Sequence, residues 1–270
     1  FPDRFFDIGI AEQDMLGTAA GLALAGKIPF VTTYGVFVAG RAWDQIRTTI
    51  CYADINVKIA GAHGGVSVGP DGATHQALED IALMRVLPGM TVVVPCDAIE
   101  AKKATIGVAK IQGPCYLRFA REATPVFTKE EDFFQIGKAN TLKDGSDVSI
   151  IACGPIVYES IQAAEELQKE GISARVINMH TIKPLDEEAV LKAATETGAI
   201  VTAEEHQIAG GLGGTIAEFL AINMPTPIEM VGVKDTFGES GTPEELAEKY
   251  ELTASDIVKA VKKVLSRKNS

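Results

Sequence analysis

Cysteine is scarce in this sequence, and the few copies are scattered. The 270 residues contain four cysteines, at positions 51, 96, 115 and 153, each among apolar neighbours and none in a Cys-x-x-Cys pair. That spacing excludes the common zinc and dithiol redox motifs, and we expect no metal ligands from this chain. Buried, reduced thiols are the simpler interpretation, which predicts a cytoplasmic location.

Long apolar runs and clustered positive charge are absent as well. The most apolar run near the start, residues 15–26, is interrupted by Gly17 and Gly21 and is too short to span a bilayer. The first residues do not have the pattern of a signal peptide. The formal net charge is −11, whereas a surface that binds nucleic acid needs clustered lysine and arginine. We therefore expect neither a membrane nor a nucleic acid as a partner.

Apolar runs of β character alternate with helical patterns along the chain, which is typical of parallel α/β architecture. The first series has predicted strands at 28–33, 56–60, 91–94 and 115–119, and predicted helices at 12–24, 38–52, 76–87 and 98–110. The second has predicted strands at 148–152, 174–178, 199–203 and 228–231, predicted helices at 156–170, 186–197 and 215–221, and two closing helices. Charged and turn-prone residues separate the two series. We therefore predict two α/β domains, each built on a parallel sheet, over residues 1–124 and 144–270, with a linker at 125–143.

A glycine-rich loop from His63 to Gln76 follows the second predicted strand. It holds two of the chain's four histidines, His63 and His75, on either side of Asp71. Ordered glycine costs conformational entropy, so glycines beside two imidazoles and a carboxylate indicate a loop shaped around a ligand. A lone histidine is more often a core residue than a catalyst, but this pairing favours a function. The glycines leave the geometry of metal ligands unspecified, which argues against a metal site.

Other candidate side chains follow predicted strand ends, where open α/β sheets bind ligands. Glu12 stands at a loop-to-helix junction, either as an acid that suits the helix dipole or as a carboxylate with a tuned pKa. Tyr34 and Phe37 follow the first strand, either as part of a core stripe or as a platform for a flat ring. Arg118 and Arg121 come at the end of the fourth strand, where each binds a phosphate or carboxylate or pairs with the following acids.

Several of these residues stand in motifs that resemble those of a known enzyme family. The motifs are Gly-Ile-Ala-Glu-Gln at 9–13, Gly-Pro-Asp-Gly-Ala-Thr-His-Gln at 69–76, Arg-Val-Leu-Pro-Gly-Met at 85–90, Pro-Cys-Asp at 95–97 and Thr-Ala-Glu-Glu-His at 202–206. In this order they resemble the C-terminal half of a transketolase, across essentially the whole chain. The resemblance implies a thiamine diphosphate pyrimidine-binding domain followed by a transketolase C-terminal domain. It also implies transfer of a two-carbon ketol unit between ketose and aldose sugar phosphates.

The resemblance assigns cofactor contacts to three candidates. Glu12 would hydrogen-bond the aminopyrimidine ring of thiamine diphosphate and favour its reactive tautomer, so that it counts as catalytic. Phe37, with Tyr34, would stack on the same ring. At Gly40 larger family members often carry a third aromatic residue, so the stacking surface is expected to be smaller here.

The resemblance assigns substrate contacts to the remaining candidates. His63 and His75 would contact the ketose hydroxyls and transfer protons, a catalytic task that suits imidazole. Asp71 would bind a substrate hydroxyl, and Arg121 matches the arginine that holds a sugar phosphate.

One expected segment is missing from this sequence. It contains no Gly-Asp-Gly with a downstream Asn, the segment that holds the diphosphate and Mg2+ in this family. The diphosphate-binding domain therefore comes from a separate N-terminal subunit or from a removed upstream region, or it has been lost. The first alternative implies a split enzyme of the pentose phosphate pathway, in which this chain self-associates into a dimeric core and completes a heterotetramer.

Other interpretations remain open at this stage. A deoxyxylulose-phosphate synthase or a 2-oxo-acid dehydrogenase β subunit would share the cofactor, but the first lacks a histidine at the position of His63 and the second lacks the whole 69–76 loop pattern. A non-catalytic scaffold would have no need of the candidate site residues. Residues 210–214 form a glycine-rich stretch, but Ile216 stands where a dinucleotide fingerprint needs its third glycine. We interpret this stretch, His180 and His206 as structural.

Overall fold

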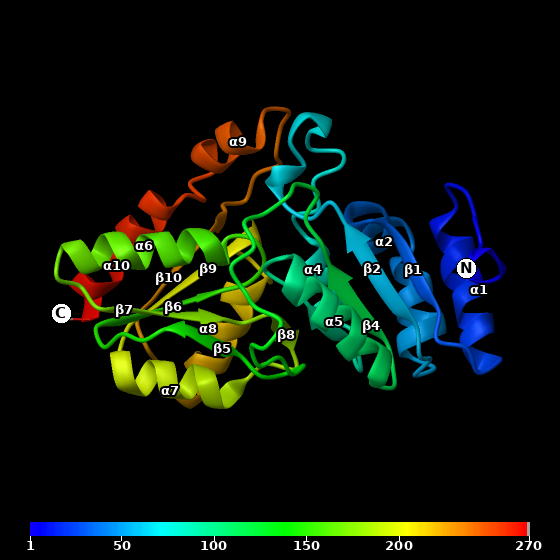
Figure 1. Cartoon of the computed structure of the whole chain (residues 1–270), viewed down its shortest axis with the longest axis horizontal. Helices are drawn as coiled ribbons and strands as arrows, with labels where there is room; N and C mark the ends of the chain where they lie inside the picture. Colours follow the sequence, from blue (N-terminus) through cyan, green and yellow to red (C-terminus); the bar gives the residue numbers. More distant parts are fainter. Residues whose placement is uncertain (269–270) are drawn as a thin grey trace.

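The computed structural model describes residues 1–268 and contains two sheets of mostly parallel strands flanked by helices (Figure 1), which confirms the predicted α/β class. The first sheet has the order β1-β2-β4-β3-β8, built from β1 (Phe30–Tyr34), β2 (Lys58–Ala62), β3 (Thr91–Val93), β4 (Cys115–Arg118) and β8 (Thr181–Lys183). The second has the order β10-β9-β6-β7-β5, built from β5 (Asn140–Lys143), β6 (Val148–Ala152), β7 (Ala174–Asn178), β9 (Ile200–Gln207) and β10 (Ile228–Val233). Among the strands within residues 1–268, only the edge strands β8 and β5 pair antiparallel with their neighbours.

The helices connect these strands in sequence. The first half contains α1 (Glu12–Leu24), α2 (Gly35–Arg41), α3 (Trp43–Gln45), α4 (Asp80–Arg85) and α5 (Ala98–Lys110), with short helical turns η1 (Pro2–Arg4), η2 (Ile46–Cys51) and η3 (Val66–Asp71). The second half contains α6 (Val157–Lys169), α7 (Glu187–Thr197), α8 (Leu212–Asn223), α9 (Pro243–Lys249) and α10 (Ala254–Lys268). Within residues 1–268, no helix combines the length and the apolar character that crossing a membrane requires.

Side-chain caps explain where several helices begin. Thr242 and Glu245 form the reciprocal capping box at the start of α9, with Pro243 as the first helical residue. At the start of α5 the Asp97 carboxylate accepts a hydrogen bond from the Glu100 amide, but the Glu100 side chain accepts from the amide of Cys96. The cap of α5 is therefore shifted by one residue from a standard capping box.

The structure differs from the sequence-based prediction in four elements. β5 lies within the predicted linker at 125–143, and β8 leaves the second series to pair with β3 at the edge of the first sheet. The helix predicted at 38–52 is divided into α2, α3 and the π-helical turn η2. The helix predicted at 76–87 begins only at Asp80, because Gln76 is held by hydrogen bonds to the preceding loop. The boundaries predicted for the two domains stay a prediction.

The hydrophobic core has two main parts, and each contains residues from both halves of the chain. Leu16, Val38 and Ile59 pack in the cluster around the first sheet. Val66, near the start of the glycine-rich loop, and Leu78, just after its end, belong to the cluster around the second sheet. The ends of this loop are therefore anchored in the core of the second half of the chain.

Candidate active site

The parallel register of β1 and β2 brings three predicted site residues together. Tyr34 is paired with Ala62, so His63 follows directly at the carboxyl edge of the sheet. The ring centroids of Tyr34 and His63 are 4.1 Å apart and meet edge-on. Phe37 lies in the first turn of α2, and its ring also meets that of Tyr34 edge-on, at 5.6 Å. One strand pairing and one helical turn thus gather three rings.

His75 approaches the same rings from the far end of the glycine-rich loop. Its ring centroid lies 5.6 Å from that of Tyr34 and 5.3 Å from that of Phe37. Thr74 Oγ1 lies 2.8 Å from His75 Nδ1, so a hydrogen bond between them orients the imidazole. All four rings are half-buried, which leaves part of each accessible to a ligand.

His63 has an unusual backbone conformation and an unpaired nitrogen. Its φ is +60°, a value that non-glycine residues rarely adopt and that occurs often at functional sites. Among the described residues, its buried Nδ1 has no hydrogen-bond partner. Burial and the nearby Arg121 guanidinium lower the pKa of His63 below its ordinary value of 6.5. At neutral pH the imidazole is therefore neutral and able to take up a proton.

Arg121 and Asp71 form the polar side of this group. Arg121 Nη1 donates a hydrogen bond of 2.6 Å to the carbonyl of Val68 and lies 3.4 Å from Asp71 Oδ1. Their side chains are 34% and 30% exposed, so both remain accessible to a polar ligand. Both also act electrostatically on His63, which links them to the rings. The glycine-rich loop therefore positions the Arg121 guanidinium beside the Asp71 carboxylate.

Arg41 connects Glu12 to the rings, and the sequence reasoning missed it. Glu12 is the first residue of α1 and is 7% exposed, and its Oε1 lies 3.3 Å from Arg41 Nη1. The Arg41 guanidinium carbon lies 4.1 Å from the centroid of Phe37. A signal for this contact is present in the sequence, because Arg41 stands four residues after Phe37, on the same face of a helix. All seven predicted residues lie within one connected group, which with Arg41 we call the edge cluster.

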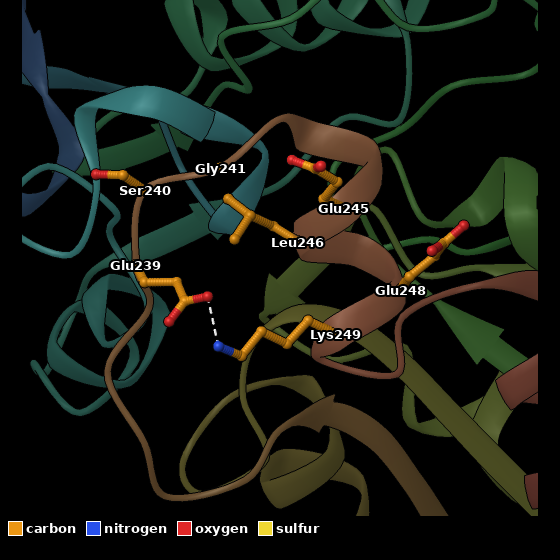
Figure 2. A pocket seen from close by; sticks show the side chains of 7 residues that line it. All are labelled: Glu239, Ser240, Gly241, Glu245, Leu246, Glu248 and Lys249. Carbon is orange, nitrogen blue, oxygen red and sulfur yellow. Dashed lines mark hydrogen bonds and ion pairs between the residues drawn. The ribbon is translucent and has the colours of Figure 1, made fainter.

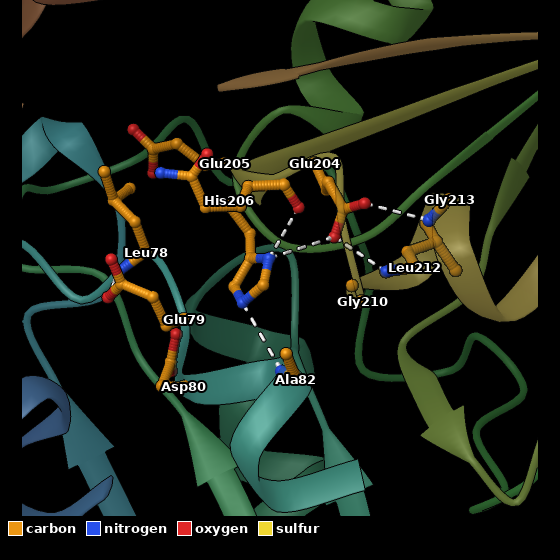
Figure 3. Close-up of polar contacts among 12 residues, drawn as sticks. Leu78, Glu79, Asp80, Ala82, Glu204, Glu205, His206, Gly210, Leu212 and Gly213 are labelled. Atoms are coloured by element: carbon orange, nitrogen blue, oxygen red, sulfur yellow. Dashed lines mark hydrogen bonds and ion pairs between the residues drawn. The ribbon is translucent and has the colours of Figure 1, made fainter. Parts of the chain in front are cut away.

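A second set of ionisable side chains lies buried between the two sheets. Arg118 Nε donates to both carboxylate oxygens of Asp80, at 2.9 and 3.2 Å, and its Nη2 donates to the carbonyl of Glu205. His206 Nδ1 lies 2.7 Å from the carbonyl of Gln207, and its Nε2 accepts from the amide of Ala82 at 3.4 Å (Figure 3). Asp80, Arg118, Glu204, Glu205 and His206 form what we call the interdomain network. Arg118 is thus a buried salt-bridge partner, one of its two predicted alternatives.

The glycine-rich stretch at 210–214 binds a side chain of this chain. The Glu204 carboxylate accepts hydrogen bonds from the amides of Leu212 and Gly213, at 2.7 and 2.8 Å (Figure 3). Burial raises the pKa of Glu204 to about 7. A carboxylate therefore occupies the start of α8, where a dinucleotide would place its pyrophosphate. His180, at 0% exposure, stacks on Phe134 and lies 2.9 Å from Thr181 Oγ1.

Two family models match the chain in succession. The pyrimidine binding domain of transketolase matches residues 1–126, and the C-terminal domain of transketolase matches residues 137–257. A 6-deoxy-6-sulfo-D-fructose transketolase subunit from a Clostridium species is 46% identical over 99% of this chain and 83% of its own length. A putative transketolase C-terminal section from Methanocaldococcus jannaschii is 45% identical over 97% and 83% of the two chains. The chain belongs to the transketolase family.

A solved structure agrees with this family assignment. The chain superposes on one described as a split gene transketolase, inactive beta4 tetramer, with a TM-score of 0.94 and 50% identity, over 99% of this chain and 86% of that one. The two α/β units are therefore transketolase pyrimidine-binding and C-terminal domains. Membership of this family implies thiamine diphosphate as the cofactor.

The edge cluster fits the aminopyrimidine ring of that cofactor. The Arg41 guanidinium, a flat group with N–H donors, already lies between the Glu12 carboxylate and the Phe37 ring. A group in the space between Glu12 and Phe37 contacts a hydrogen-bond acceptor on one side and an aromatic face on the other. A flat heterocycle with ring nitrogens would make the same two contacts. Glu12 and Phe37 are thus able to hold it, with Tyr34 against the edge of Phe37.

Proposed function

We propose that this chain is the C-terminal subunit of a split transketolase, which transfers a two-carbon ketol unit from a ketose phosphate to an aldose phosphate. The observation that carries the proposal is the edge cluster, which combines a cofactor-binding pair with two imidazoles, a carboxylate and an arginine at one sheet edge. The names of the related proteins, which include a subunit, a C-terminal section and a split gene product, support the same conclusion.

Each predicted residue of the edge cluster has a task in this reaction. Glu12 accepts a hydrogen bond from the aminopyrimidine ring, and Phe37 provides a surface for it. When bound, thiamine diphosphate supplies the nucleophilic carbon that cleaves the ketose carbon–carbon bond. The neutral His63 accepts a proton from a substrate hydroxyl, and His75 binds a neighbouring hydroxyl.

The remaining polar residues set which substrates bind. Asp71 accepts a hydrogen bond from a sugar hydroxyl. Arg121 donates to the terminal anionic group, because guanidinium matches the geometry of a phosphate. The sulfonated substrate named for one relative has an anion of similar shape. We therefore propose a phosphorylated ketose as the donor and treat a sulfonated one as a test case.

The site also requires residues from a second protein. Phe5, Phe6 and Ile10 precede Glu12 and are 75%, 59% and 90% exposed. An apolar surface of this size next to a buried carboxylate is typical of a face that a partner covers. We propose that an N-terminal transketolase subunit contributes the diphosphate and Mg2+ site, with two copies of this chain in a heterotetramer.

Turnover measurements on the assembled enzyme test this function. The chain is mixed with a candidate diphosphate-binding subunit, thiamine diphosphate and Mg2+, and the transfer from a ketose phosphate to an aldose phosphate is followed. We expect turnover in the mixture and none with either subunit alone. Turnover with pyruvate as the donor would instead indicate a deoxyxylulose-phosphate synthase. No turnover with any donor would favour the scaffold interpretation.

A further inference from the structure

The glycine-rich loop, which carries His63, Asp71 and His75 of the edge cluster, is held from outside by the C-terminal domain. Val66 lies in the hydrophobic cluster of the second sheet, together with residues such as Ile150 and Val201. Figure 1 places α9 directly beside the η3 segment, the cyan strip at the top of the view. The position of His75 and Asp71 therefore depends on contacts with residues in the second half of the chain.

Glu205, near the end of β9, makes the most specific of these contacts. Its Oε1 accepts a hydrogen bond of 3.0 Å from the amide of Ser67, and its Oε2 accepts one of 3.0 Å from the hydroxyl of Ser67. Glu205 is only 9% exposed, so few water molecules compete for these bonds. Charged acceptors in such settings form the stronger class of hydrogen bonds. One carboxylate therefore fixes both the backbone and the side chain of a loop residue.

The loop sequence fits around this carboxylate. Gly65 has a φ of +92°, and a Cβ atom at this position would overlap with the Glu205 carboxylate. Arg118 Nη2 donates to the carbonyls of Glu205 and Ala77, at 2.9 and 2.8 Å, and so joins the strand to the end of the loop. Burial raises the pKa of Glu205, while Arg118 and the two Ser67 hydrogen bonds oppose that rise.

A second contact holds the loop at its far end. Gln76 Nε2 donates to the carbonyls of Val66 and Glu239, at 3.2 and 2.9 Å. Figure 2 shows the segment with Glu239 and Ser240 running alongside α9, with an ion pair between Glu239 and Lys249. The pocket of about 500 Å³ between them is lined by Glu239, Lys249 and the buried Leu246, among others, and the hydrogen bond from Gln76 ties this segment to the loop.

We infer that Glu205 is a positioning residue of the transketolase reaction, which holds the loop carrying His63, Asp71 and His75 in place through its two hydrogen bonds to Ser67. The inference rests on the proposed function and extends it to the C-terminal domain. It assigns that domain a role in substrate binding without any contact to substrate. The cofactor pair Glu12 and Phe37 lies on α1 and α2, outside the loop, and is not held by Glu205.

Two variants test this role by removing one or both of the hydrogen bonds between Glu205 and Ser67. Ser67→Ala removes the hydroxyl bond and keeps the amide bond, while Glu205→Ala removes both acceptor oxygens. Ser149→Ala is the matched control, because it likewise removes a serine hydroxyl that forms a hydrogen bond, here with Thr197 at 3.0 Å within the second domain. Hydrogen exchange of the loop amides is measured on the chain itself, and the kinetics are measured on the assembled enzyme.

We expect faster exchange in residues 63–76 for both variants and unchanged exchange for Ser149→Ala. We expect the KM for the ketose donor to rise about three- to tenfold in Ser67→Ala, as the loss of one hydrogen bond predicts, and further in Glu205→Ala, which loses both. The dissociation constant of thiamine diphosphate should stay within about twofold, because the cofactor pair lies outside the loop. If Glu205 had only a structural role, the variants would have a lower melting temperature, but the KM for the donor would not rise more than the dissociation constant of thiamine diphosphate.

The outcomes separate this inference from the proposed function. If the wild-type mixture turns over and Ser67→Ala has wild-type kinetics, the positioning role is wrong. If the wild-type mixture does not turn over, the proposed function fails, and the exchange measurement alone decides whether Glu205 holds the loop. Wild-type exchange in both variants would overturn the inference in either case.

Discussion

The edge cluster and the interdomain network contain similar side chains, but these are paired in different ways. In the interdomain network, the Glu204 carboxylate accepts two backbone hydrogen bonds, and Arg118 meets the Asp80 carboxylate at 2.9 Å. In the edge cluster, the Nδ1 of His63 has no partner among residues 1–268, and Glu12 pairs with an arginine that is 54% exposed. The polar groups of the interdomain network thus find their partners within the chain, whereas some of those in the edge cluster are left without one among residues 1–268.

This difference teaches that a large pKa shift does not by itself identify the functional site. The pKa values of Glu204 and His206 are shifted to about 7 and about 4, both mainly by burial. Structural networks perturb pKa values as strongly as active sites do. What distinguishes the edge cluster is accessible capacity for hydrogen bonds, since that capacity is what a ligand uses. Substitutions in the two sets should therefore affect different properties.

Replacing Glu12 should have the largest effect on activity and almost none on folding. We expect Glu12→Ala to lower kcat of the assembled enzyme by about 100- to 10,000-fold, the range for loss of a residue that takes part in acid–base catalysis. The melting temperature should hardly change, because an ion pair with an exposed arginine contributes little to stability. Steady-state kinetics and calorimetry on the same preparation measure both quantities.

Asp14→Ala provides the control, because Asp14 is an exposed acid in the same helical turn as Glu12. It should retain wild-type kcat. If Glu12→Ala also retained wild-type kcat, the cofactor role of Glu12 would be wrong and the contrast between the two clusters would lose its strongest support.

Replacing His206 should change the pH dependence of stability. The pKa of buried His206 is lowered from 6.5 to about 4, so between these values the unfolded chain binds more protons than the folded one. Stability therefore falls as the pH drops through this window, by at most about 3 kcal/mol. His206→Gln has no imidazole to protonate, so its free energy of unfolding does not fall for this reason. The difference in unfolding free energy between wild type and variant should therefore narrow from pH 7 to pH 4. Urea unfolding across this range measures it.

Glu204→Gln is expected to give the opposite trend. Burial raises the pKa of Glu204 from 4.5 to about 7, so the folded chain binds the extra proton between these values. That contribution to stability is present at low pH and is lost as the pH rises towards 7. The advantage of the wild type over this variant should grow on acidification. Parallel curves for all three proteins would contradict both assignments.

Replacing Arg121 should have a smaller effect, limited to substrates with an anionic group. We expect Arg121→Ala to raise the KM for a ketose phosphate about 10- to 100-fold, as loss of a charge-assisted hydrogen bond predicts, and to change the KM of an unphosphorylated ketose far less. Arg267→Ala, at an arginine in α10 that pairs with Glu229, is the control and should change neither. An equal rise for both substrates would exclude the phosphate role.

Most of the fold could be predicted from the sequence because its regular elements have strong local patterns. The buried β6 is apolar along its length, and α9 carries the residues of a complete cap. β5 and β8 could not be predicted in the same way. Each is three or four residues long, and each pairs at a sheet edge with a strand whose position the local sequence does not specify.

The candidate site divides along a similar line. Tyr34 and His63 could be placed together, because the ends of neighbouring parallel strands meet at one edge. The link from Ser67 to Glu205 joins residues 138 positions apart, and no spacing rule predicts such a contact. The contact of Arg41 could be predicted only weakly, because an exposed arginine on a helix usually faces solvent and its four-residue spacing from Phe37 is a common one.

Replacing Arg41 gives the smallest expected change, and it tests whether the cofactor ring takes the place of the Arg41 guanidinium in the edge cluster. Its guanidinium occupies the space between Glu12 and Phe37 and must leave before a flat ring enters. A contact of this kind at an exposed site is worth about 0.5–1 kcal/mol, so we expect Arg41→Ala to bind thiamine diphosphate about two- to fivefold more tightly. Arg47→Ala, at a nearby exposed arginine, should not change the affinity. Weaker binding in Arg41→Ala would mean that the guanidinium contributes to the cofactor site. Its contacts with Glu12 and Phe37 would then be permanent ones, like the contacts within the interdomain network, and the contrast between the two sets would not hold for this pair.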